Sequence, residues 1–107
     1  LASPEKSTGR RLFDDVVRGG AQASGRNTGR IAAGYWADMF ALDTTSEHLW
    51  GRAQDMALDS WVFAGDDRLV TDVWSAGRHM VKGGEHVQRG QIVAAYKRTI
   101  DALRDTL

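Results

Sequence analysis

The sequence predicts an α+β fold in which a helix near each end of the chain flanks several short strands. Three observations predict it. Apolar residues recur at helical spacing within residues 12–17 and again over residues 92–107. Between them lie short β-prone runs that glycines separate. With 107 residues the chain holds one small domain at most, and it is too short for a complete (β/α)8 barrel, which needs roughly 250 residues.

The first helix begins just after a polar N-terminal loop. Ser7 or Thr8 can cap it by accepting a backbone N–H bond. The glycine pair at 19–20 is expected to stop or break the helix, and a further helical turn over residues 21–24 should end at Gly25. The apolar stripe that predicts this helix consists of Leu12, Phe13, Val16 and Val17.

The middle of the chain reads as short strands and turns. Residues 26–34 predict a turn with a short strand, and residues 47–58 predict a loop with one or two helical turns. The further strands that we expect cover residues 37–42, 60–64, 69–75 and 79–82, with turns at 65–67 and 76–78 and a stop at the glycines 83–84.

Residues 89–107 predict the clearest helix. Its apolar residues step by four, four, three and four positions, which keeps them on one face. Lys97 and Asp101 stand at i and i+4, a spacing at which an ion pair can stabilise the helix by about 0.3 kcal/mol. The stripe consists of Ile92, Tyr96, Ile100, Leu103 and Leu107.

Composition excludes several classes of protein. The 14 basic and 14 acidic residues give a formal net charge of zero, which argues against a nucleic-acid partner. The absence of cysteine excludes disulfides, thiolate zinc sites and a cysteine nucleophile. No apolar run suits a membrane span and the first residues are not a signal peptide, so we expect a cytoplasmic protein without a membrane partner. Because the chain begins at Leu1 rather than Met, we expect a piece of a longer or processed protein.

The residues that could carry chemistry do not form a site by their spacing. His48, His79 and His86 have no zinc-ligand spacing, and we interpret them as surface or hairpin histidines. The aspartate pairs at 14–15 and 66–67 fit solvated surfaces. The four tryptophans (Trp36, Trp50, Trp61 and Trp74) are expected in core or subunit contacts rather than in a surface that stacks bases. Chemistry alone therefore predicts no self-sufficient catalyst.

Three segments resemble a known family. Residues 29–39 read G-x-I-x-x-G-x-x-A-D-M, residues 20–25 read G-A-x-A-S-G, and residues 73–84 read V-W-S-A-G-R-H-M-V-K-G-G. In this order and spacing they resemble the part of the amidohydrolase superfamily in which the chain leaves the last barrel helix and enters a small β-sandwich. The motif positions, which we interpret as structural, are Gly29, Gly34, Ala37, Asp38, Gly77 and Gly83. Asp38 is expected to make a turn or a hydrogen bond where its strand begins.

Within the superfamily, residues 59–65 and 84–86 are most similar to deiminases that act on a formimino group. The resemblance implies zinc-dependent hydrolysis of N-formimino-L-glutamate to N-formyl-L-glutamate and ammonia, as in histidine degradation, with zinc supplying hydroxide near neutral pH. Two alternatives stay open: another deaminase of the superfamily, such as a guanine deaminase-like enzyme, and a non-catalytic β-sandwich that binds a partner.

The resemblance also implies how the chain is divided. Residues 1–26 would end the barrel, residues 27–88 would form part of the small sandwich, and residues 89–107 would be a C-terminal helix packed on the body of the protein. The family's metal ligands lie on barrel strands before Leu1, so no catalytic, metal-binding or substrate-binding residue is expected in this chain. The expected partners are the N-terminal barrel of the same protein, its small-molecule substrate, and a second copy in a homodimer.

Overall fold

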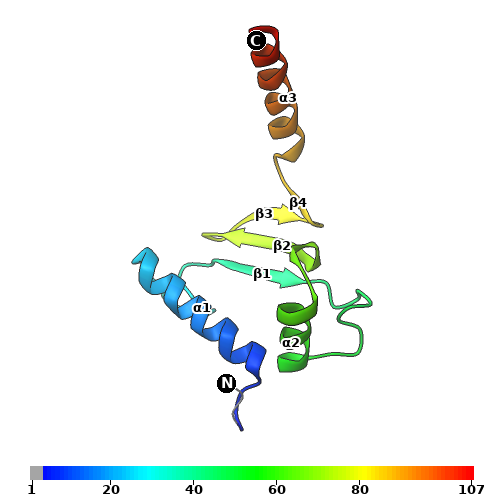
Figure 1. Cartoon of the computed structure of the whole chain (residues 1–107). Helices are drawn as coiled ribbons and strands as arrows, with labels where there is room; N and C mark the ends of the chain where they lie inside the picture. The colour runs from blue at the N-terminus through cyan, green and yellow to red at the C-terminus, as the bar shows by residue number, and fades with distance from the viewer. Residues whose placement is uncertain (1–3) are drawn as a thin grey trace.

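The computed structural model describes residues 4–107, and these residues form an α+β unit of three helices and one four-stranded antiparallel sheet (Figure 1). The predicted α+β class is therefore confirmed. Of the predicted N-terminal loop, the first three residues lie outside the described part. In chain order the elements are α1 (Thr8–Ser24), β1 (Met39–Leu42), α2 (Gln54–Ala64), a 3-10 turn (Asp67–Leu69), β2 (Val70–Ser75), β3 (Arg78–Lys82), β4 (Glu85–His86) and α3 (Arg89–Asp105).

Helix α1 is longer than the sequence predicts. Ser7 is its N-cap, and the Ser7 hydroxyl accepts the N–H of Arg10 at 3.2 Å. The helix runs through the glycines 19–20, so the predicted break there is wrong. Each glycine costs roughly 1 kcal/mol relative to alanine, which weakens a helix without ending it. The end comes at Gly25, which has a left-handed φ of 67° and donates its N–H to two carbonyls of the last turn.

Two predicted strands are absent among the described residues. Residues 60–64 form the second half of α2, so the strand predicted there is wrong. A short apolar run fits a strand or a buried helix equally, and here Trp61 packs on rings from α1 and β1 from a helical position. Residues 26–34 contain no strand either, because the left-handed glycines Gly29 and Gly34 turn the backbone repeatedly.

The sheet has the order β1-β2-β3-β4, and each strand pairs antiparallel with the next. The strands predicted over 37–42, 69–75 and 79–82 are present with slightly different ends, and β4 was not predicted. Ala76 and Gly77 join β2 to β3 with φ of 52° and 78°. Two successive positive φ values are typical of the tight hairpin turn whose twist matches that of the strands.

The core of the described residues is small. Among residues 4–107, Leu49 and Leu69 are the buried large apolar residues, with 0% and 6% of their surface exposed. Beside them, Phe13 of α1, Phe40 of β1 and Trp61 of α2 form a cluster with ring centroids 5.3 to 6.1 Å apart. Many large apolar side chains lie on the surface, so the unit buries little of its own apolar area.

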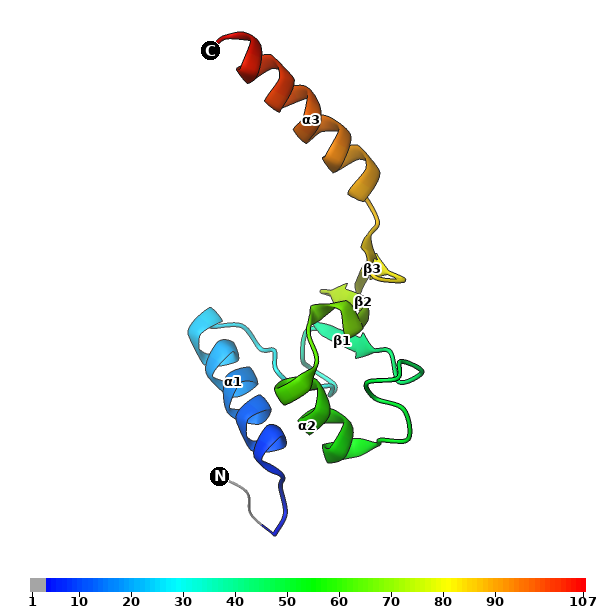
Figure 2. The same cartoon turned by 45° about the vertical axis from the view of Figure 1, so that its right-hand side comes forward.

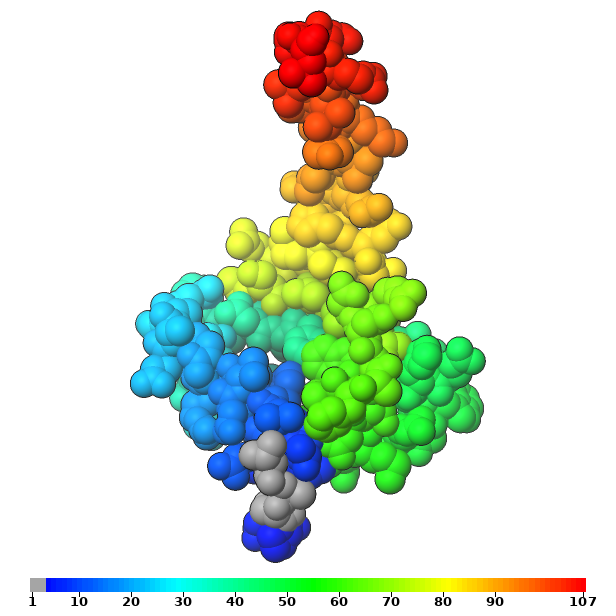
Figure 3. All heavy atoms as spheres, in the orientation of Figure 1, coloured from blue at the N-terminus to red at the C-terminus, as the bar shows by residue number. Residues whose placement is uncertain are grey.

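The shape is elongated because α3 leaves the sheet and stands away from the other helices (Figures 1 and 2). The unit measures 61 × 35 × 25 Å, with a radius of gyration of 17.9 Å. A compact domain of this length has a radius of gyration of about 13 Å. The space-filling view shows α3 as a projection above the body (Figure 3). Among residues 4–107, no helix has the length and apolar character that crossing a membrane requires.

Candidate functional site

Asp38 links three segments of the chain. It lies directly before β1, and its Oδ1 accepts the N–H of Ala76 at 2.7 Å, in the turn between β2 and β3. Its Oδ2 accepts the hydroxyl of Thr28 at 3.0 Å, and Arg26 lies 3.6 Å from the same oxygen. These bonds, the Ala76 N–H first, hold the pKa of Asp38 below its ordinary value. A charged carboxylate therefore fastens the loop after α1 to the hairpin.

The other motif residues serve turns and close backbone contacts. The Gly77 N–H donates to the carbonyl of Ala37 at 2.9 Å, which adds a second bond between the start of β1 and the hairpin turn. Gly29 has a φ of 91°, and a Cβ there would come within 3.2 Å of Ala21 on α1. Gly34 and Gly83 also have positive φ values, of 85° and 55°. The motif residues therefore support tight turns, one close approach of the loop at Gly29 to α1, and one backbone bond between the start of β1 and the hairpin turn.

A second cluster joins α1 to α2. Asp59 of α2 accepts the hydroxyl of Ser7 at 2.7 Å and the N–H of Gly9 at 2.8 Å, so it caps α1 from another helix. Beside it, the carboxylate of Asp55 receives Nε of Arg10 at 2.8 Å, and this bond is the first cause that holds the pKa of Asp55 below its ordinary value. The cluster positions the two helices and leaves no free nucleophile or base.

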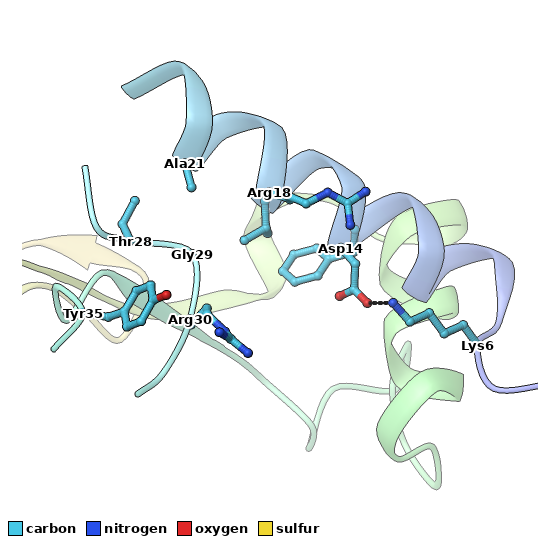
Figure 4. A pocket seen from close by; sticks show the side chains of 10 residues that line it. Lys6, Asp14, Arg18, Ala21, Thr28, Gly29, Arg30 and Tyr35 are labelled. Carbon is cyan, nitrogen blue, oxygen red and sulfur yellow. Dashed lines mark ion pairs between the residues drawn. The ribbon is translucent and has the colours of Figure 1, made fainter. Parts of the chain in front are cut away.

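A groove of about 520 Å³ lies between α1 and the loop that leads to β1 (Figure 4). Its apolar wall comes from α1, through Phe13, Val17 and Ala21. Its rim is charged, and the ion pair between Lys6 Nζ and Asp14 Oδ2, 2.8 Å long, lies at one end. The Arg30 guanidinium lies 5.8 Å from the ring centre of Tyr35. The groove therefore combines an apolar wall with a charged rim that contains Lys6, Arg18 and Arg30 together with Asp14.

A pair that the sequence analysis missed lies on the hairpin. His79 Nε2 is 2.8 Å from Asp72 Oδ2, and the His79 ring stacks on Trp74 with centroids 4.4 Å apart. The Thr71 hydroxyl, and after it His79, hold the pKa of Asp72 below its ordinary value. The residues are seven positions apart across the hairpin, and the register shifts between Val73 and Trp74, so sequence spacing gave no signal for the pair. The interpretation of His79 as a hairpin residue holds.

The remaining candidates stay apart from one another. His48 lies in an exposed turn, and His86 accepts the N–H of Gln88 at 3.0 Å. Within residues 4–107, no three His, Asp or Glu side chains gather closely enough to hold a metal ion. Trp61 and Trp74 make ring contacts, whereas Trp50 is 69% exposed and Trp36 is 51% exposed beneath the Arg26 guanidinium.

Comparison with solved structures first shows similarity to one class of enzyme. The chain superimposes on part of an amidohydrolase from Brucella melitensis with a TM-score of 0.74 and 40% sequence identity. The match covers 96% of this chain and 22% of that chain. At this identity the similarity extends beyond the fold, and it includes the segments that carry the motifs. No family model matches the sequence.

A sequence comparison then gives a particular relative. The chain is 39% identical over 97 residues to formimidoylglutamate deiminase from Pseudomonas aeruginosa, across 91% of this chain. The resemblance that the motifs predict, to amidohydrolases and within them to this deiminase, is therefore confirmed. The match covers 21% of the relative, so the chain spans about a fifth of the length of the proteins it matches.

Proposed function

We propose that this chain is a structural segment of a hydrolase that removes the imino nitrogen of N-formimino-L-glutamate. The observation that carries the proposal is the 39% identity to formimidoylglutamate deiminase over 91% of the chain. In this reaction water adds to the formimino carbon, the bond from that carbon to the terminal nitrogen breaks, and ammonia leaves. The product is N-formyl-L-glutamate, so one water is consumed for each ammonia released.

In this proposal the residues of this chain hold the sheet and α1 in position. The groups that react with the substrate lie in the remainder of the protein. The wall of the α1 groove, with Phe13 and Val17, would receive the barrel of the same polypeptide, because exposed apolar surfaces of this kind mark interfaces. The Asp38 bonds to Thr28 and Ala76 would keep the sheet fixed to α1. A fixed sheet would in turn hold α1 in place against the barrel.

Zinc is expected from the resemblance, but the described residues do not fit it. A zinc site needs three or four nitrogen, oxygen or sulfur donors that converge at about 2 Å. The His79–Asp72 pair brings two donors together, and both are already bonded to each other. No step of the reaction is therefore assigned to a metal held by this chain, and the donors would come from the barrel.

The proposal is tested with the complete polypeptide that carries this segment. Purified protein is incubated with N-formimino-L-glutamate and, in parallel, with guanine, and released ammonia is measured. We expect ammonia from the first substrate, and formyl product in equal amount by mass spectrometry. Release from guanine alone would instead support the guanine deaminase-like alternative. Release from neither substrate would contradict the proposed reaction.

Substitutions within this chain separate a supporting role from a reacting one. Asp38→Asn keeps the shape of the side chain but removes the charge that holds the Ala76 N–H. We expect this variant to lose activity in proportion to loss of folded protein, with KM for the formimino substrate unchanged in the folded fraction. A fall in kcat in fully folded protein would show that Asp38 acts in the reaction and would overturn the structural role.

A further inference from the structure

We draw no further inference here: the strongest candidate, the exposed apolar stripe of α3 around Ile92, Tyr96 and Leu103, belongs to a chain that spans about a fifth of the length of the proteins it matches, and nothing in the described residues shows what covers it.

Discussion

The contact between α1 and α2 makes the substitution Gly9→Ala a sensitive probe of the fold. Gly9 is the second residue of α1, and its N–H donates to Asp59 Oδ1 at 2.8 Å. A Cβ at this position would lie 2.9 Å from the Cα of Asp59 and would collide with the Asp59 carboxylate. Because a backbone atom is involved, rotation of a side chain cannot relieve the collision.

The expected magnitude follows from three opposing effects. Alanine favours the helix over glycine by about 0.5–1 kcal/mol. Forcing apart a close packing costs about 1–3 kcal/mol. Weakening the bond from the Gly9 N–H to Asp59 costs about 0.5–1.5 kcal/mol more. The last two effects exceed the first, so Gly9→Ala should lower the free energy of unfolding by about 0.5–4 kcal/mol.

Gly19→Ala provides the matched control in the same helix. A Cβ at Gly19 would meet nothing within 4 Å, so only the helix preference acts, and the variant should gain about 0.5–1 kcal/mol. Both variants and the wild type are compared by thermal unfolding at one protein concentration. Gly19→Ala should have the highest melting temperature, the wild type an intermediate one, and Gly9→Ala the lowest. A Gly9→Ala protein that melts above the wild type would refute the proposed contact between the two helices.

Other predictions follow from the turn, the carboxylates and the aromatic cluster. Ala76→Gly should raise the free energy of unfolding by about 0.5–1 kcal/mol in urea titrations, because Ala76 has a φ of 52° that glycine adopts without strain. Asp38→Asn should speed hydrogen exchange of the Ala76 amide, and unchanged exchange would contradict their bond. Folding lowers the pKa values of Asp38, Asp55 and Asp72. The three carboxylates therefore stabilise the folded protein fully above their pKa in the unfolded chain, about 3.9. This stabilisation is lost as the pH falls from that value through the lower pKa values of the folded state. Urea titrations from pH 5 to pH 2 should show this loss, and a smaller loss in Asp55→Asn. Phe13→Ala should cost about 2 kcal/mol in the same titrations, since its half-buried ring contacts two others, and a change below about 0.5 kcal/mol would argue against the cluster.

The sequence predicted the elements whose periodicity is long or whose turns are chemically distinctive. The stripe of α3 extends over several turns, the shorter stripe of α1 follows a capping serine, and the Ala76–Gly77 hairpin lies between two β-prone runs. The strand predicted over 60–64 is wrong because a run of five residues, four of them apolar, cannot distinguish a strand from a helix. The helix at 60–64 is favoured by the contact of Trp61 with Phe13 and Phe40, which are at least 21 positions away in sequence.

The sequence likewise predicts some residues of the candidate site and not others. The motif drew attention to Asp38, but its partners Thr28 and Ala76 come from ten residues before it and 38 residues after it. The pairing of His79 with Asp72 depends on a β-bulge that shifts the register between two strands. That register cannot be predicted from the neighbouring residues in the sequence. The exposed stripe of α3, in contrast, is readable from spacing alone, and only the fold reveals that no described residue covers it.

The most direct test of the account compares this 107-residue chain with the complete polypeptide, under identical conditions, for ammonia release from N-formimino-L-glutamate. The account predicts release by the complete polypeptide and none by the chain alone, because the reacting groups would lie outside it. Zinc content measured on the same samples should follow the activity. Ammonia released by the isolated chain would contradict the claim that its residues serve a structural role.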